Sequence, residues 1–250
     1  MKENYNIRNL NENDILSVVN IVRGSFDEEY LLPSIYRGKG IEKFINNELK
    51  NKFSPYKYFV LCNDELVIGY AEFKVFKSES MAFLNIISVR DEYKNKGVGR
   101  KLLEYCQDFF FKNGFNAIQL DVYKTNIIAL NWYNDFGFNL IKTNSLYRIN
   151  FNNKTPVFNN IYIQNFPQFQ ELQQTLGFYF LDVIIGNKNI VIGFIENDLF
   201  LRGNYDQSIY AQLEYLSNSL KIKNVYFIGN ICQSLECSFI NEIIRMELKL

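Results

Sequence analysis

The segment KNKGVGRK, residues 94–101, places two glycines one residue apart between basic side chains. Apolar residues follow at helical spacing, so the segment leads from an extended stretch into a helix. The first backbone N–H groups of a helix have no intrahelical partner, and they lie at the positive end of the helix dipole. Because glycine lets an anion approach the main chain closely, the segment is a candidate cradle for a phosphate group.

The glycine spacing disfavours two common nucleotide-binding loops. A Walker loop has four residues between its glycines and continues with Gly-Lys-Ser/Thr, and a dinucleotide fingerprint has a third glycine. Here Arg100, Lys101 and Leu102 follow Gly99. The hypothesis of a nucleotide-phosphate binder is therefore supported by the glycine turn alone, because neither loop motif is present.

A second pattern lies further along the chain. Asn126, Ala129, Tyr133, Gly137 and Phe138 have the spacing Asn-x-x-Ala-x-x-x-Tyr-x-x-x-Gly-Phe. Together with FLNIISVRDEYKNKGVGRKLLEYC, residues 83–106, it resembles the motifs of the GNAT superfamily of N-acetyltransferases. In that family a strand ending in Val leads through Gln/Arg-x-x-Gly-x-Gly/Ala into a helix. Lys94 stands here at the position of the usual Gln or Arg, and the resemblance covers about residues 4–150.

The resemblance implies that acetyl-CoA is the co-substrate. Two central strands would splay apart, one carrying residues 85–89 and the other residues 119–122, with the pantetheine arm between them. Main-chain groups would hold the pantetheine, amides of the glycine turn would hold the pyrophosphate with Lys94 as a compatible cation, and an asparagine would orient the cofactor. The implied cofactor-binding residues are Ile87, Val89, Lys94, Lys96, Gly97, Val98, Gly99, Arg100 and Asn126.

Acyl transfer to an amine needs an acid for the departing thiolate and an acceptor that has lost a proton. The resemblance implies that Tyr133 is the acid, and a phenol with a reference pKa of about 10 can donate a proton at neutral pH. The alternative is that Tyr133, one of 17 tyrosines, only packs beside Trp132. Glu72 is a candidate base and Asp121 another, although each could be an ordinary strand carboxylate, and the amine could also arrive neutral.

The chain contains no histidine, which excludes Ser/His/Asp and Cys/His triads and histidine-ligated metals. Four cysteines, Cys62, Cys106, Cys232 and Cys237, lack the two-residue spacing of zinc and redox motifs. We therefore expect structural thiols and no metal.

Composition limits the partners. The 27 basic residues balance 27 acidic ones, so no bulk attraction to nucleic acid or to an anionic membrane is expected. The N-terminal residues lack an apolar core suited to a secretory signal, and no later stretch approaches 18 uninterrupted apolar residues. These features predict a cytoplasmic protein.

The order of predicted elements indicates an α+β fold, with a mostly antiparallel GNAT-type sheet flanked by helices. Residues 1–150 would form the acetyltransferase domain, with a helix capped by Asn13 or Asp14 near its start, and the polar, proline-containing residues 150–160 would be a linker. Residues 151–250 would form a smaller α/β domain. The segment IVIGFIE, residues 190–196, echoes LVIGYAE, residues 66–72, so the second domain reads as a shortened repeat. Chance similarity of two β-rich hairpins is the alternative.

Two functions compete at this stage. The first is an enzyme that transfers an acetyl group from acetyl-CoA to a primary amine by direct attack in a ternary complex. Its second half would shape the acceptor cleft or form a subunit interface, as in a homodimer. The second is a non-catalytic regulatory module that binds acyl-CoA. Acceptor specificity in the family usually comes from the loop between the first two helices, where Asp27, Glu28, Glu29, Tyr30 and Tyr36 would suit a cationic amine or simply form a solvated face.

Overall fold

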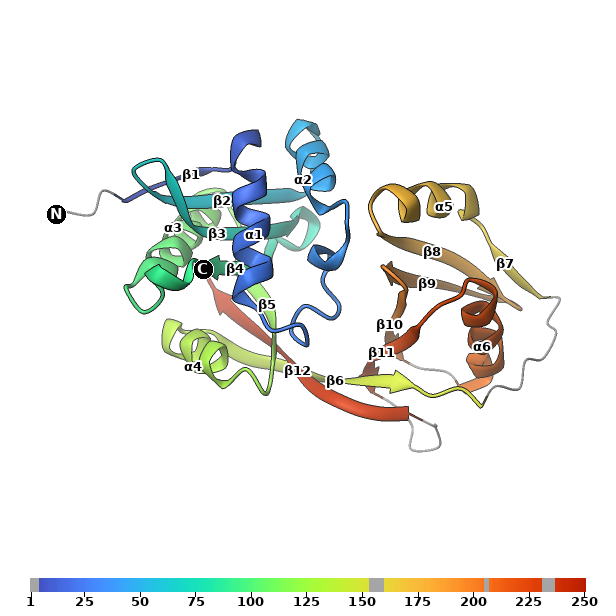
Figure 1. Ribbon diagram of the computed structural model, residues 1–250. Coiled ribbons are helices and arrows are strands. Elements are labelled where there is room, and N and C mark those ends of the chain that lie inside the picture. The colour runs from blue at the N-terminus through green and yellow to red at the C-terminus, as the bar shows by residue number, and fades with distance from the viewer. Residues whose placement is uncertain (1–4, 153–159, 205–206, 231–236) are drawn as a thin grey trace. The chain divides into compact units, whose positions relative to one another are not determined.

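The computed structural model describes residues 5–152, 160–204, 207–230 and 237–250 (Figure 1). The chain divides into two compact units, each taken here by itself. Unit 1 comprises Met1–Leu31, Ile41–Lys142 and Ile244–Leu250, and unit 2 comprises Leu32–Gly40 and Thr143–Ile243. In the part of the chain that is described, no helix has the length and apolar character needed to cross a membrane.

Unit 1 is a twisted sheet with helices on both faces (Figure 1). Its strand order is β1-β2-β3-β4-β5-β12, antiparallel from β1 to β4 and parallel between β4 and β5. Its strands are β1 (Tyr5–Asn9), β2 (Tyr56–Asn63), β3 (Leu66–Phe76), β4 (Met81–Val89), β5 (Ala117–Tyr123) and the end of β12 (Cys237–Lys249). Its helices are α1 (Ile15–Ser25), α2 (Ile41–Lys50), α3 (Val98–Lys112) and α4 (Ile127–Phe136), and β6 (Asn139–Ile149) begins in it. The predicted mostly antiparallel sheet flanked by helices is confirmed.

The core of unit 1 explains why α3 forms where the sequence places it. Val98, Leu102, Cys106 and Phe110 recur every four residues and are at most 1% exposed, so they form one buried face of the helix. The Phe110 ring lies 4.7 Å from that of Phe73 on β3, between ring centroids. On the opposite face of the sheet, the Ser88 hydroxyl donates to a carbonyl of α1 at 3.5 Å. The sheet is therefore covered by α3 on one face and α1 on the other.

Strands β4 and β5 separate after a short ladder. Their parallel pairing runs from Met81–Ala117 to Leu84–Leu120. At the next residue, the register between β3 and β4 shifts, so that Asn85 is an extra residue without an opposite partner. A β-bulge of this kind bends the strand that carries it. The predicted splay is therefore present, but its β5 side begins at Asp121, since Gln119 and Leu120 are still paired.

Unit 2 repeats this topology. Its strand order is β7-β8-β9-β10-β11-β6, again antiparallel up to β10 and parallel between β10 and β11. Its own elements are β7 (Ile161–Ile163), α5 (Phe166–Thr175), β8 (Phe178–Ile185), β9 (Lys188–Ile195), β10 (Asp198–Asn204), α6 (Tyr210–Ser219) and β11 (Asn224–Asn230). The two echoing segments lie on β3 and β9, the third strand of each order. The strand order thus supports the predicted repeat.

One difference separates the units. In unit 2, β10 and β11 pair without interruption from Asp198–Asn224 to Asn204–Asn230. Gly229 has a φ of +158° and approaches Gly203 so closely that a Cβ on it would overlap the carbonyl oxygen of Gly203. Over the described residues 198–204 and 224–230, the two strands of unit 2 therefore show no gap like the one between β4 and β5 of unit 1.

The compact units differ from the predicted ranges 1–150 and 151–250 in three segments. Residues 143–150 and 32–40 belong to unit 2, and residues 244–250 belong to unit 1. Segment 32–40 is held in unit 2 by an ion pair of 2.7 Å between Arg37 and Asp198 and by a 2.9 Å bond from the Gly40 amide to the Leu176 carbonyl. Seven of the predicted linker residues, 153–159, lie outside the described residues, and the domain boundary at 150 stays a prediction.

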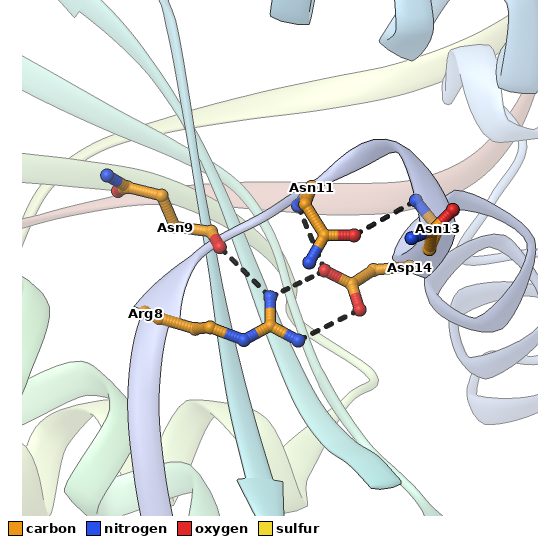
Figure 2. Close-up of polar contacts among 5 residues, drawn as sticks. All are labelled: Arg8, Asn9, Asn11, Asn13 and Asp14. Carbon is orange, nitrogen blue, oxygen red and sulfur yellow. Dashed lines mark hydrogen bonds and ion pairs between the residues drawn. The ribbon is translucent and has the colours of Figure 1, made fainter. Parts of the chain in front are cut away.

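A polar cluster fixes the entry to α1 (Figure 2). The Arg8 guanidinium donates to both carboxylate oxygens of Asp14, at 2.6 and 3.0 Å, and the Asn11 amide donates to Asp14 at 2.9 Å. Asp14 precedes α1 but makes no side-chain cap to it, and Asn11 instead caps the preceding 3-10 turn, Glu12–Asp14, by accepting from the amide of Asn13. Asp14, one of the two predicted positions, is thus the N-cap residue of α1, although its side chain makes no capping hydrogen bond to that helix. The Asp14 carboxylate instead accepts hydrogen bonds from the Arg8 guanidinium and from the Asn11 amide.

Asp14→Asn should lower the free energy of unfolding at pH 7 by about 1 to 3 kcal/mol, because it removes charge-assisted hydrogen bonds from a buried group. Burial alone would raise the pKa of Asp14, but the hydrogen bonds from Arg8 and Asn11 outweigh it, and the net pKa is lowered. A lowered folded pKa stabilises the protein above the unfolded value of about 3.9, and this stabilisation is lost as the pH falls through the folded pKa.

Chemical denaturation between pH 7 and pH 3 measures this effect. The difference between wild type and Asp14→Asn should shrink below about pH 4. Glu12→Gln is the matched control, because the Glu12–Lys50 pair is 3.5 Å long with both side chains more than half exposed. It should change the unfolding free energy by about 0.5 kcal/mol or less. A constant difference across the whole pH range would contradict the assignment.

Candidate active site

The glycine turn forms an open helix N-terminus. Gly97 is the N-cap of α3 with a φ of +78°, and Asn95 is also left-handed, at +60°. The amide of Lys101 makes the first intrahelical bond, 3.0 Å to the Gly97 carbonyl. No side chain caps this end, and no acidic residue lies in the first turn. The amides of Val98, Gly99 and Arg100 therefore remain available to an anion.

Gly99 lies where three elements meet. A Cβ on Gly99 would stand 3.5 Å from Cζ2 of Trp132 on α4 and 3.6 Å from Cγ2 of Val89 on β4. Around Gly97, by contrast, no atom lies within 4 Å of the equivalent position. The turn is thus packed on the side of the sheet and open at Gly97.

The basic side chains of the turn are all exposed. Lys94 Nζ lies 2.6 Å from the Asp91 carboxylate, and Lys96 Nζ lies 5.3 Å from the centre of the Tyr93 ring. The Arg100 guanidinium lies 5.5 Å from the centre of the Phe136 ring. These cations add local positive charge to the helix N-terminus at the solvent boundary.

The main-chain groups of Ile87 and Val89 face the gap between β4 and β5. In an antiparallel ladder, the residues of one strand point their N–H and C=O groups alternately toward and away from the neighbouring strand. The Arg90 amide donates to the Ile68 carbonyl on the β3 side at 2.9 Å. By alternation, Ser88 also points to β3, whereas Ile87 and Val89 point away from it, beyond the last residue that pairs with β5. The Val89 carbonyl also accepts from the Ser25 hydroxyl at 3.3 Å. Binding of pantetheine by main-chain groups of Ile87 and Val89 stays a prediction.

The second motif mainly determines the ends of α4. The Asn126 side-chain oxygen accepts from the Ala129 amide at 3.1 Å and caps the helix start. Gly137, with a φ of +109°, ends the helix, and the Phe138 amide donates to the Tyr133 carbonyl at 3.0 Å. This is the glycine-terminated C-cap that many helices share. Four of the five motif residues thus have a structural reason for their spacing.

Tyr133 is the motif residue that capping does not explain. Its side chain is buried, and its ring lies 5.0 Å from that of Trp132 and 5.5 Å from that of Phe138, between centroids. Burial raises the pKa of Tyr133, so the phenol keeps its proton at neutral pH. Both the packing role and the donor role predicted from the sequence are compatible with this position.

The two candidate bases have different surroundings. Glu72 on β3 is 1% exposed, and its carboxylate accepts from the Tyr70 hydroxyl at 3.2 Å and the Asn85 side-chain amide at 2.9 Å. Asp121 on β5 accepts two hydrogen bonds from Arg245 on β12, both of 2.8 Å. Sequence reasoning did not identify Asn85 or Arg245 as partners, because they lie 13 and 124 residues away along the chain.

The acidic residues of the predicted acceptor loop, Asp27, Glu28 and Glu29, are exposed. The Tyr30 ring lies 5.4 Å from that of Tyr123, whereas Tyr36 is 1% exposed and belongs to segment 32–40 of unit 2. The three acids therefore form a solvated face.

The cysteines have the environment of structural thiols. Cys62 and Cys106 are buried, Cys237 is half-buried, and burial raises the pKa of each thiol. Cys232 lies outside the described residues. Among the described residues, no group of three or more His, Cys, Asp or Glu side chains could hold a metal ion.

Comparison with known proteins identifies relatives of unit 1. Residues 18–138 match the model of the Acetyltransferase (GNAT) family. Over 146 residues, the chain is 25% identical to a spermidine N(1)-acetyltransferase of Thermoplasma acidophilum, covering 55% of this chain and 89% of that enzyme. Over 89 residues, it is 32% identical to the [ribosomal protein bS18]-alanine N-acetyltransferase of Escherichia coli K12, covering 36% of this chain and 59% of that enzyme.

Similarity of fold extends over the second unit as well. A crystal structure of a GCN5-related N-acetyltransferase from Sphaerobacter thermophilus superposes with a TM-score of 0.62. The match covers 98% of this chain and 95% of that protein at 8% sequence identity. At this identity the comparison concerns the fold alone, and it agrees with the repeated strand order.

Asn126→Ala should lower the free energy of unfolding by about 1 kcal/mol, because it removes the N-cap of α4. Asn126→Asp should keep the cap and most of the stability. Asn134→Ala, an exposed position within the same helix, is the matched control and should be neutral or slightly stabilising. Thermal unfolding of the three variants measures this. Equal stability of Asn126→Ala and wild type would show that the cap contributes nothing.

Proposed function

We propose that the chain, whose residues 18–138 match the acetyltransferase (GNAT) family, transfers an acetyl group from acetyl-CoA to a primary amine. The observation that carries the proposal is the position of the uncapped N-terminus of α3 beside the gap between β4 and β5. The first offers backbone amides to a pyrophosphate, and the second offers main-chain groups to an extended arm. A ligand with both parts, such as a CoA thioester, fits the combination.

The reaction is a direct attack within a ternary complex. The lone pair of a neutral amine forms a bond to the thioester carbonyl carbon, the carbon–sulfur bond breaks, and the electron pair leaves on the CoA sulfur. The Ile87 amide, which faces the gap, is placed to donate to the carbonyl oxygen as negative charge develops on it. Tyr133 is the proposed donor of a proton to the departing thiolate.

The acceptor nitrogen also loses a proton, and no exposed side chain of the site is assigned as the base that takes it. Glu72 is the base proposed from the sequence, but its carboxylate is 1% exposed. It can influence an acceptor only through a group that connects it to the gap. The Tyr70 hydroxyl and the Asn85 side-chain amide, which donate to its oxygens, are neutral groups.

The named relatives suggest two acceptor classes. One relative is named for spermidine and the other for the alanine of a ribosomal protein. Both acceptors present a primary amine, which is the chemistry that direct attack requires. Spermidine and a peptide with N-terminal alanine are therefore the first acceptors to assay.

Acetyl-CoA should bind with a stoichiometry of one per chain in a calorimetric titration, since β10 and β11 of unit 2 stay paired along all the residues described for them. Gly97→Ala should weaken this binding by about tenfold or more, because a methyl group enters the open turn and the φ of +78° becomes strained. Gly114→Ala is a close control, since Gly114 at the other end of α3 also has a φ of +78° and no atom within 4 Å of a Cβ. Equal affinity of the two variants would place the pyrophosphate elsewhere.

Tyr133→Phe should lower kcat by about a hundredfold or more while acetyl-CoA affinity stays the same, because only the proton donor is removed. Tyr105→Phe on α3, an exposed tyrosine that contacts Phe59 by its ring, should leave kcat unchanged. Steady-state assay of CoA release with both acceptors measures this. Full turnover in Tyr133→Phe would assign the residue to packing. Wild-type binding of acetyl-CoA without turnover of any amine would favour the non-catalytic regulatory module.

A further inference from the structure

The β-bulge in β4 presents one side chain at the point where the strands diverge. Asn85 and Ile86 together oppose Glu72, so both side chains of the bulge point to the same face of the sheet as Glu72. Asn85 is exposed, whereas Ile86 and Glu72 are buried. Asn85 is therefore the polar side chain that connects the buried carboxylate to the start of the gap.

The hydrogen bond to Glu72 determines how the Asn85 amide is turned. The Asn85 side-chain NH₂ group donates to a carboxylate oxygen of Glu72 at 2.9 Å and therefore faces Glu72. The carbonyl oxygen of the same planar amide then points away from Glu72. The Glu72 carboxylate also accepts a hydrogen bond from the hydroxyl of the buried Tyr70 at 3.2 Å. The exposed side of Asn85 is consequently its hydrogen-bond acceptor.

We propose that Asn85 is the residue that binds the acceptor amine, and that Glu72 is a positioning residue that orients Asn85. This rests on the proposed function, which places the thioester beside Ile87, two residues further along β4. An amine N–H donated to the Asn85 carbonyl oxygen would hold the nitrogen at the start of the gap, on the strand that also stabilises the thioester oxygen. Glu72 thus takes a role different from that of the base proposed above.

The chemistry of the amide suits a nucleophile. A carboxylate at this position would form an ion pair with the ammonium form and so hold the amine in the state that cannot attack. A neutral carbonyl oxygen accepts an N–H from the neutral amine and leaves its lone pair available. The hydrogen bond from its NH₂ group to Glu72 polarises the amide, which strengthens the carbonyl oxygen as an acceptor. The site therefore selects amines whose nitrogen has at least one N–H to donate to Asn85 as well as the lone pair that attacks the thioester.

Steady-state kinetics with acetyl-CoA and either spermidine or an alanyl peptide test the proposal. Asn85→Leu keeps a similar volume but removes the acceptor oxygen, and it should raise KM for the amine by about tenfold or more. The acetyl-CoA affinity, measured separately by calorimetry, should stay within about twofold, which also shows that the variant is folded. Asn116→Leu, the same substitution at an exposed position just before β5, should leave both constants unchanged.

Glu72→Gln separates a positioning residue from a base. A positioning role predicts a rise in KM for the amine with kcat nearly retained, because the neutral glutamine still accepts from Asn85 but no longer dictates its orientation. A base predicts a fall in kcat by about a hundredfold with KM unchanged. That result, or an unaltered amine KM in Asn85→Leu, overturns the proposal. Failure of the proposed function looks different, since the wild type itself would then turn over neither amine, and the inference would fall with it.

Discussion

The bulge at Asn85 is the feature on which the rest of unit 1 depends. A parallel pair of strands in the middle of a sheet would normally continue its ladder, because each unpaired main-chain group costs free energy when it is buried. Here the ladder ends at Leu84–Leu120, and the bulge bends β4 from the next residue onward. The main-chain groups of Ile87 and Val89 are thereby exposed to the gap. The sheet tolerates the interruption because β3 keeps its pairing with β4 and the cores on the two faces remain packed.

The helix α3 depends on the same divergence. Its buried face packs on β2 and β3, and Gly99 fits its start between Val89 and Trp132. A Cβ at Gly99 would make ordinary van der Waals contacts with Trp132 and Val89, so this position closes the turn against β4 and α4. Gly97 is different, because its φ of +78° favours glycine and no atom lies near its Cβ position. The turn is therefore packed where it meets the sheet and open where an anion can enter.

Unit 2 shows what the same topology looks like without the interruption. Its corresponding strands, β10 and β11, pair along seven residues, and Gly229 lies close to the Gly203 carbonyl. Its helix α6 follows a segment without the paired glycines. The strand order is preserved because it is determined by hydrophobic patterning and by chain connectivity. No gap is present among the residues described for these two strands, and a gap would require unpaired main-chain groups that cost free energy when buried.

The sequence by itself indicated most elements of unit 1, the two motifs and a resemblance to the GNAT family, whereas it placed residues 244–250 with the second half. Periodicity identified β2, β3, β4 and α3, since one face of each packs on the core, and the Asn-to-Phe motif marked both ends of α4 through its cap and its glycine. The site residues drawn from these motifs, such as Ile87, Gly97 and Tyr133, therefore lie on elements that local patterns can locate. Their roles in binding and catalysis stay predictions.

Only the tertiary structure decided which side chains meet. The pairing of Asp121 with Arg245 and the contact of Asp14 with Arg8 depend on strand neighbours and on chain reversals that no local pattern encodes. The same holds for the membership of segment 32–40 in unit 2, which an ion pair to Asp198 secures across 161 residues. The bulge is the most consequential case. It depends on the register between β3 and β4, and a shift of one residue there changes which side chain reaches Glu72.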